Sequence, residues 1–308
     1  MELTICGGGS LGLAYAGLMA DWVSPKLFVR SPSQAADIMA QGVTVSITDG
    51  SVLHAPVKAS ADPSILADTE IAICLVKYPD TASLGAQLSD HLSPSATVVS
   101  LQTGVRPLAD YRTLLGRDRV LGGVSYLGAR RTGPASVSIG TNLRTVLGLD
   151  GATEQHAARV QALVDALADT SLEFEVSQDI AQVIWDKMII ACSQNSVSGL
   201  TGATFRQLRE DVTWHPILAK LVAEIEAAGT ATGANFAPDQ LQRVFANWES
   251  LPDHRASTYV DLEGGRLTEV DALNGTIAEL GREYGLDAPI NEMLTAMVHL
   301  AERAAPKS

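Results

Sequence analysis

Several features that mark other classes of protein are scarce or missing in this chain. Only 3 of its 308 residues are Cys, they lie far apart in apolar runs, and no His stands near them at metal-ligand spacing. We therefore expect small, buried, reduced thiols and neither a disulfide framework nor a metal site. No apolar run reaches the roughly 18 residues that a membrane span needs, and no basic segment precedes an apolar one at the N-terminus. The sequence predicts a cytoplasmic protein without a membrane partner.

Positive charge is also scarce. The chain has 22 Lys and Arg against 35 Asp and Glu, a formal net charge of -13 and a pI of about 4.8. Such a surface repels nucleic acid and anionic lipid. An anionic small molecule can still bind where basic side chains or a helix N-terminus override the overall field. We expect a small-molecule substrate and no nucleic-acid partner, and a homodimer is one assembly state that the sequence leaves open.

The first half of the chain alternates between strand and helix patterns. Residues 3–6 are a short apolar run, a glycine-rich turn follows, and residues 13–22 predict a helix. A hairpin signal, Thr48-Asp49-Gly50, separates two strand patterns. Residues 70–76 and 97–101 are continuous apolar runs, as in strands buried on both faces, and further strand patterns lie at residues 26–30, 120–124 and 145–149. This alternation predicts a Rossmann-like, doubly wound α/β domain over residues 1–176.

After about Ser177 the strand patterns stop. The sequence predicts helices over residues 179–197, 216–230, 238–248, 267–284 and 289–303. Residues 177–308 are therefore expected to form an all-helical second domain, with a frayed tail over residues 304–308.

The glycine-rich turn Gly7-Gly8-Gly9-Ser10-Leu11-Gly12 predicts a dinucleotide site. Its first Gly permits a tight turn, its second lets the backbone approach a pyrophosphate, and its third permits close packing of helix and strand. A glycine-rich turn without a ligand is the alternative. Arg30-Ser31 stands where an NAD site usually has an acidic residue, and a guanidinium suits a 2′-phosphate, so NADPH is favoured. The alternative is an Arg that faces solvent, as we also expect for Arg130-Arg131 in a loop.

Lys187 stands in a strongly apolar helix pattern, and Asn195 follows it by about two turns on roughly the same face. Burial would lower the pKa of this Lys toward neutrality, which suits a proton donor. A Lys that extends from a half-buried helix to solvent is an equally good interpretation on spacing alone. Glu269 opens a predicted helix, where an acidic residue also compensates the helix dipole.

Several segments together resemble the ketopantoate reductase family. Residues 257–275 contain Ser, Asp, Gly-Arg, Thr-Glu and Asn-Gly at the spacings of that family's C-terminal signature. Trp185-Asp186-Lys187 with Asn195 resembles its catalytic-lysine helix. Val76-Lys77 resembles its cofactor-contacting lysine, and residues 121–124 also fit its pattern. The resemblance extends from Leu3 to about Met293.

The resemblance implies a Rossmann-like domain, a helical domain and an NADPH-dependent reduction of ketopantoate to pantoate in pantothenate biosynthesis. Lys187 would be the general acid, and Glu269 would bind the substrate hydroxyl, orient Lys187 and contact the cofactor. Asn195 and Ser257 would bind the substrate. Besides the glycine-rich turn and Arg30, the resemblance implies that Lys77, Thr103 and Ala129 contact the cofactor. Thr103 would also contact the substrate.

Two positions depart from the family pattern. Thr103 replaces the Asn of a Gln-Asn-Gly sequence, and Ala191 replaces a second Asn one turn after Lys187. The loss of two amides makes the predicted pocket less polar and is expected to alter substrate choice. Alternatives that keep the fold are reduction of an imine, turnover of a different oxo or hydroxy acid, and a non-catalytic NADPH sensor. Lys187 and Glu269 argue against the sensor, because a protein that only binds NADPH does not need a buried acid and a carboxylate that orients it.

Overall fold

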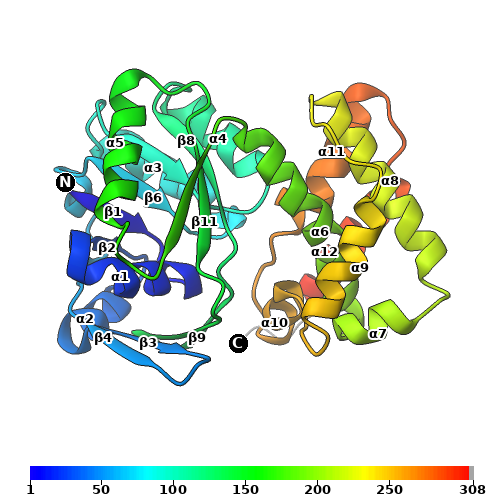
Figure 1. Cartoon of the computed structure of the whole chain (residues 1–308), viewed down its shortest axis with the longest axis horizontal. Coiled ribbons are helices and arrows are strands. Elements are labelled where there is room, and N and C mark those ends of the chain that lie inside the picture. The colour runs from blue at the N-terminus through cyan, green and yellow to red at the C-terminus, as the bar shows by residue number, and fades with distance from the viewer. Residues whose placement is uncertain (305–308) are drawn as a thin grey trace. The chain divides into compact units, whose positions relative to one another are not determined.

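The computed structural model describes residues 1–304, so the expectation for the last four residues lies outside the described chain. The structure divides into two compact units. The first combines Met1–Gln102 with Pro107–Ile180, and the second combines Thr103–Arg106 with the chain from Ala181 onward. Figure 1 shows both in the colours of the chain order.

An eight-stranded sheet forms the centre of the first unit, in the order β12-β11-β8-β7-β6-β1-β2-β5. Neighbouring strands are parallel except for β11 against β8. In chain order the strands are β1 (Leu3–Cys6), β2 (Lys26–Phe28), β5 (Lys58–Ser60), β6 (Ile71–Cys74), β7 (Thr97–Ser100), β8 (Val120–Ser125), β11 (Arg144–Gly148) and β12 (Glu173–Ser177). The order runs outward from β1 in both directions, which is the doubly wound arrangement that the sequence predicts.

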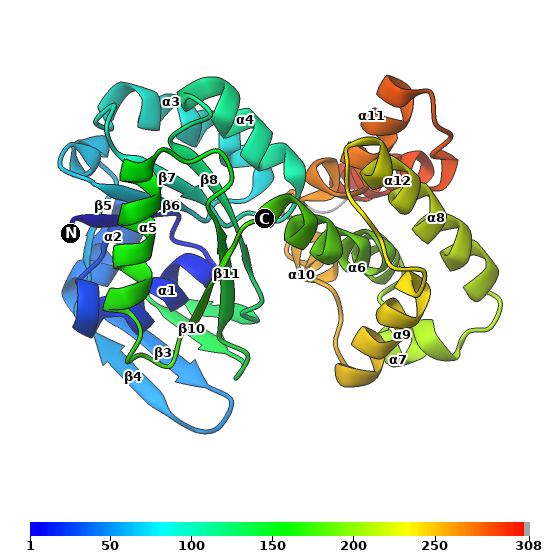
Figure 2. The same ribbon diagram turned by 45° about the horizontal axis from the view of Figure 1, so that its top comes forward.

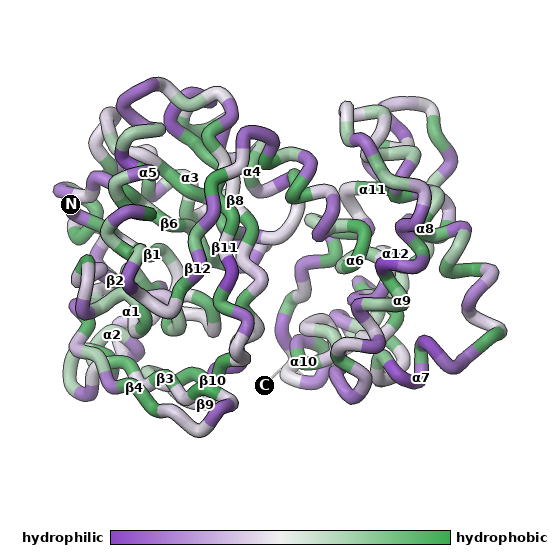
Figure 3. Tube along the Cα trace, viewed as in Figure 1, coloured by the Kyte–Doolittle hydropathy of each residue, from purple (hydrophilic) through white to green (hydrophobic). Residues whose placement is uncertain are grey.

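Helices cover both faces of this sheet. They are α1 (Ser10–Val23), α2 (Pro32–Gln41), α3 (Thr81–His91), α4 (Val105–Leu115) and α5 (Glu154–Ala166), with short 3-10 turns η1 (Pro63–Leu66) and η2 (Tyr78–Asp80). Figure 2 shows α3 and α4 on one face and α1 and α5 on the other. Every residue of β1, β6 and β7 is buried, because helices on both faces exclude water from the parallel strands. Figure 3 shows the hydrophobic residues concentrated along these central strands.

A second sheet of four strands completes this unit, in the order β4-β3-β10-β9. Strands β3 (Val43–Ile47) and β4 (Val52–Ala55) form the predicted hairpin around Asp49. Strands β9 (Ala129–Gly133) and β10 (Ser136–Ile139) form another that the sequence did not indicate. The expected loop around Arg130-Arg131 is therefore wrong, because both residues lie in β9. That strand is an exposed sheet edge, where charged side chains are common, so its pattern shows no apolar face.

The second unit is helical throughout its described part. Its elements are α6 (Ile180–Thr201), α7 (Phe205–Glu210), α8 (His215–Ala231), α9 (Gln240–Ser250), α10 (Ser257–Glu263), η3 (Val270–Ala272), α11 (Asn274–Tyr284) and α12 (Pro289–Ala304). The prediction of one helix over residues 267–284 is wrong. Leu273, with φ −109° and ψ −104°, interrupts it and separates η3 from α11. None of the helices in the described chain is long and apolar enough to cross a bilayer.

Candidate active site

The glycine-rich turn between β1 and α1 fits a dinucleotide pyrophosphate. Gly7 has φ +124°, which favours glycine, and a Cβ on Gly12 would lie 1.8 Å from the carbonyl oxygen of Gly7. The turn is thus tight enough to demand both glycines. A Cβ on Gly9 would meet nothing within 4 Å, so open space lies beside the first turn of α1. The N–H groups of that turn have no capping side chain, and they suit a bound phosphate.

Neighbouring elements hold this turn in place. Gln34 of α2 donates hydrogen bonds from its Nε2 to the carbonyl oxygens of Gly8 at 2.7 Å and Pro134 at 2.9 Å. The hydroxyl oxygen of Ser10 accepts a hydrogen bond from the backbone N–H of Arg131 at 3.0 Å. The hairpin that begins at Ala129 is therefore tied to the turn at two points. Ser10 keeps its own hydroxyl proton for donation to a ligand.

Arg30 lies just beyond the end of β2, where the sequence predicts the 2′-phosphate contact. Its side chain is 86% exposed, and its Nη1 lies 2.9 Å from Oδ1 of Asp80. The hydroxyl oxygen of Ser31 instead caps α2 by accepting the backbone N–H of Gln34 at 3.3 Å. The structure thus supplies Arg30 with an acidic neighbour that lies 50 residues away in the sequence.

Lys77 lies between β6 and the short turn η2, and its backbone carbonyl accepts the N–H of Asp80 at 2.9 Å. The loop after β6 also runs against the glycine-rich turn. A Cβ on Gly7 would lie 2.9 Å from the backbone of Leu75. The carboxyl ends of β1, β2 and β6 therefore carry the predicted cofactor residues on adjacent strands.

In the second unit, α6 places Lys187 in a largely apolar environment. The side chain is half-buried, and the residues three and four positions away on the same helix, Val183, Ile184, Ile190 and Ala191, are all apolar. Burial lowers the pKa of Lys187 to about 8, and the carboxylate of Glu269 opposes this shift through its charge. Lys187 and Glu269, which are 82 positions apart in the sequence, are therefore close enough to interact. Glu269 precedes η3 rather than opening a long helix.

Asn195 lies two turns after Lys187 on α6 and is half-buried. Its side-chain amide makes no hydrogen bond to any other residue of the described chain, so it remains available to a ligand. Ala191, which lies between them, is buried and only 7% exposed. Ser257 is the exposed first residue of α10.

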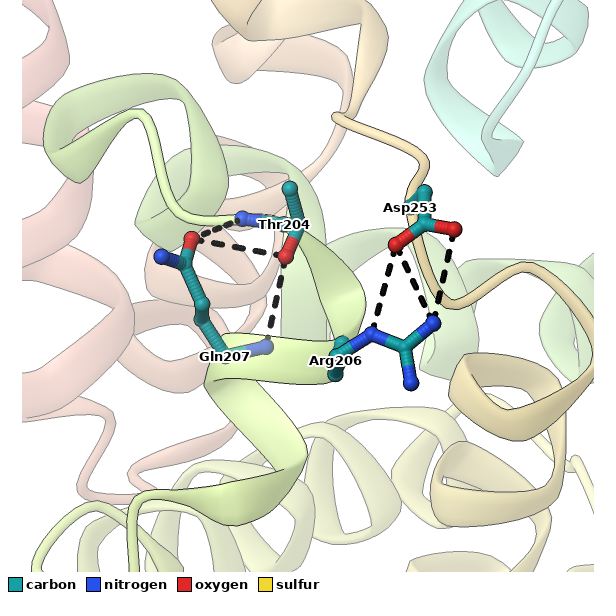
Figure 4. Close-up of polar contacts among 4 residues, drawn as sticks. All are labelled: Thr204, Arg206, Gln207 and Asp253. Atoms are coloured by element: carbon teal, nitrogen blue, oxygen red, sulfur yellow. Dashed lines mark hydrogen bonds and ion pairs between the residues drawn. The ribbon is translucent and has the colours of Figure 1, made fainter.

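The segment that leads to Ser257 is held by α7 (Figure 4). The guanidinium of Arg206 contacts the carboxylate of Asp253, with Nη2 3.1 Å from Oδ1. The backbone N–H of Phe205 donates to the carbonyl of His254 at 3.0 Å, and that of Ala256 donates to the Ser198 hydroxyl at 3.1 Å. Thr204 and Gln207 form a capping box that fixes the start of α7. These contacts position the N-terminus of α10.

Thr103 lies in the short segment that groups with the second unit. The next residue, Gly104, has φ +106°, and a Cβ there would lie 2.6 Å from the carbonyl oxygen of Ala272. Only glycine fits such a close approach. Thr103 is half-buried, and its neighbour Gly104 brings the segment against η3, which Glu269 precedes.

Other residues of the 257–275 motif have structural roles that the sequence did not reveal. The guanidinium of Arg266 donates to the carboxylate of Asp261 at 3.2 Å and to the carbonyl of Val260 at 2.7 Å. Asn274 is fully buried, accepts the Ser196 hydroxyl at 2.6 Å, and donates to the carbonyl of Cys192 at 3.0 Å. Asn274 therefore joins α11 to α6, which explains why the predicted long helix is interrupted. Ser257 and Glu269 remain as the motif's polar groups with a predicted ligand role.

No group of three or more His, Cys, Asp and Glu side chains within residues 1–304 is placed to hold a metal ion. Among the predicted site residues, Lys187 has an amine with a lowered pKa, Asn195 and Ser257 have hydrogen-bonding groups, and the glycine-rich turn and Arg30 have donors that suit an anion.

Two family models match the chain. The model for ketopantoate reductase PanE/ApbA matches residues 3–151, and the model for its C-terminal part matches residues 179–302. The sequence is 27% identical over 305 residues to the 2-dehydropantoate 2-reductase of Halobacterium salinarum, with 98% of this chain and 99% of that protein covered. It is also 27% identical over 320 residues to the enzyme of the same name from Mesorhizobium japonicum, with 97% of both covered.

Solved structures share the fold. A PanE/ApbA family ketopantoate reductase from Ralstonia eutropha superimposes with a TM-score of 0.90 at 28% identity, over 99% of both chains. A D-mandelate dehydrogenase in complex with NADH and anilino(oxo)acetate superimposes with a TM-score of 0.88 at 21% identity, also over 99% of both chains.

Proposed function

The chain belongs to the ketopantoate reductase family, a family of NADP-dependent oxidoreductases, and we propose that it uses NADPH to reduce a small 2-oxo acid to the 2-hydroxy acid. Ketopantoate is the best single candidate substrate, which would place the reaction in pantothenate biosynthesis in the cytoplasm. The observation that carries the proposal is the half-buried Lys187 beside Glu269. Its pKa of about 8 suits an amine that donates a proton near neutral pH.

In this proposal, residues of the first unit would bind the phosphate groups of the cofactor. NADPH supplies the hydride when it is bound. The N–H groups of the glycine-rich turn would hold the pyrophosphate, and Arg30 would pair with the 2′-phosphate. Lys77 and Ala129 lie in segments that flank the turn, and we assign them contacts to the cofactor, as we do for Thr103 and Glu269. The Gln34 and Ser10 hydrogen bonds keep the turn in a fixed shape before the ligand arrives.

The proton comes from the second unit. As the carbonyl carbon of the substrate accepts hydride, its oxygen becomes an alkoxide, and the ammonium of Lys187 gives that oxygen a proton. The products are the 2-hydroxy acid and a neutral lysine amine, which regains a proton from solvent. Glu269 orients the amine and accepts a hydrogen bond from the new hydroxyl. Asn195 and Ser257 hydrogen-bond the substrate carboxylate and hydroxyl, which holds the carbonyl in line for the transfer.

The polarity of the side chains at positions 103 and 191 should influence which 2-oxo acid the chain prefers as substrate. Positions 103 and 191 carry Thr and Ala, so neither supplies the side-chain amide that the family pattern has there. This supports a substrate with fewer polar groups than ketopantoate as the second candidate. The fold is compatible with such a change, since a D-mandelate dehydrogenase shares it.

The test is NADPH oxidation followed by absorbance against a panel of 2-oxo acids and imines. The panel should include ketopantoate, phenylglyoxylate and short aliphatic 2-oxo acids. We expect turnover of at least one 2-oxo acid, and because of the changes at Thr103 and Ala191 we expect at least one other 2-oxo acid or imine to have a higher kcat/KM than ketopantoate. Turnover of imines alone would replace the 2-oxo acid assignment. NADPH binding without turnover of any compound would favour the sensor.

A further inference from the structure

The ion pair between Arg30 and Asp80 lies at the predicted 2′-phosphate contact. Arg30 follows β2 and Asp80 ends η2 in the loop after β6. These two strands flank β1, whose carboxyl end carries the glycine-rich turn. The pair therefore connects the segments on either side of the turn, with Nη1 and Oδ1 2.9 Å apart.

This geometry opposes the binding of a 2′-phosphate in two ways. The phosphate needs the Arg30 guanidinium, which the Asp80 carboxylate already contacts, so binding must break or share that contact. A dianionic phosphate on Arg30 would then lie within a few ångströms of a second negative charge, and like charges at such a distance repel. A ribose 2′-hydroxyl carries no charge and can donate a hydrogen bond to a carboxylate.

We propose that Asp80 is a specificity-determining residue that narrows the preference for NADPH over NADH by competing for Arg30 and repelling the 2′-phosphate. This inference rests on the proposed dinucleotide site and concerns only the choice between its two ligands. Arg30 supplies the attraction for the phosphate, and Asp80 offsets part of it. The chain therefore discriminates between the two nucleotides less than Arg30 alone would.

The exposure of the pair limits the size of this competition. The Arg30 side chain is 86% exposed and that of Asp80 45%, so water screens their attraction, and a pair of this kind contributes little to stability. A phosphate dianion can therefore displace Asp80 at small cost, while the carboxylate remains nearby. Asp80 also precedes α3, where a negative charge compensates the helix dipole. A test must separate that structural role from selectivity.

The experiment measures the dissociation constants of NADPH and NADH by titration calorimetry for the full chain and for the variant Asp80→Asn. Asp80→Glu keeps the charge and serves as the conservative variant. Asp90→Asn removes the same charge from an exposed position of α3 and serves as the matched control. Thermal unfolding of each variant reports the structural role of Asp80 at the helix start.

We expect Asp80→Asn to raise the ratio of the NADH to the NADPH dissociation constant by about threefold, mainly through tighter NADPH binding. The ratio should stay near that of the parent chain in Asp80→Glu and Asp90→Asn. The effect of Asp80→Asn should shrink at high salt, because the repulsion is screened. An unchanged or lower ratio in Asp80→Asn, with both nucleotides still bound, overturns this inference and leaves the proposed reductase intact. Failure of the parent chain to bind either nucleotide overturns both.

Discussion

Replacing Lys187 by methionine removes the proposed acid while keeping an unbranched side chain of similar length in an apolar environment. We expect kcat for 2-oxo acid reduction to fall by about 10²-fold or more, the usual scale for loss of a general acid. The dissociation constant of NADPH should change little, because the phosphates are assigned to the first unit. Stopped-flow single turnovers with saturating NADPH isolate the chemical step. Lys220→Met, at an exposed position of α8, is the matched control and should retain full activity.

The pH dependence of the parent chain tests the same group. Reduction needs the ammonium form of Lys187, whose pKa is lowered to about 8. The reduction rate should therefore be constant below pH 8. Above this pKa it should fall about tenfold for each pH unit, as expected when one required proton is lost. The oxidative direction needs the free amine and should show the opposite trend. Lys187→Arg keeps the positive charge beside Glu269 but cannot release a proton in this range, so it should be as inactive as the methionine variant.

The substitution Lys187→Met should also increase the stability of the folded chain. The ordinary lysine pKa of 10.5 and the folded value of about 8 differ by an amount that corresponds to about 3 kcal/mol at most. Because the folded pKa lies below the unfolded one, this cost is fully present below pH 8 and disappears as the pH rises from about 8 to 10.5. The pKa of about 8 already includes the attraction between Lys187 and Glu269, so Lys187→Met should raise the free energy of unfolding at neutral pH by about 1–3 kcal/mol. A variant that is as active as the parent, or destabilised at neutral pH, would refute this reasoning.

Three further substitutions test other parts of the account. Glu269→Gln removes the charge that raises the pKa of Lys187, so the midpoint of the pH profile for reduction should move below 8 and KM should rise. A midpoint that does not move would contradict the pairing of Lys187 with Glu269. Arg30→Ala should weaken NADPH binding by about tenfold in calorimetry and leave NADH binding nearly unchanged. An equal loss of affinity for both nucleotides would show that Arg30 does not bind the 2′-phosphate. Thr103→Asn restores the family's amide and should raise kcat/KM for ketopantoate relative to less polar 2-oxo acids. If steady-state kinetics show no change in this ratio, the Thr at position 103 has no effect on substrate choice.

The sequence predicted the main sheet well because its strands are buried on both faces. Continuous apolar runs such as residues 70–76 are typical of strands that helices cover on both faces, and the glycine-rich turn marks where the first strand ends. The hairpin from Ala129 to Ile139 was missed, since its edge strand carries Arg130 and Arg131 and buries little. Local composition cannot distinguish such a strand from a loop.

Long-range contacts account for the rest of what the sequence could not show. The interruption at Leu273 depends on hydrogen bonds between Asn274 and residues about 80 positions earlier, and no local helix signal contains that information. Lys187 was a candidate from its apolar surroundings alone, but its partner Glu269 followed only from the family resemblance. Asp80 gave no signal at all, because its relation to Arg30 exists only after β2 and β6 are placed on either side of β1.

The most direct test of the proposed reaction is to follow the transferred hydrogen. The chain is incubated with NADPH that carries deuterium at the transferable position of the nicotinamide and with the best 2-oxo acid of the panel, and the product is analysed by mass spectrometry and NMR. The account predicts one deuterium on the carbon that bears the new hydroxyl, formed by the parent chain and at least about 10²-fold more slowly by Lys187→Met. A hydroxy acid without deuterium at that carbon, or equal rates for the two proteins, would contradict it.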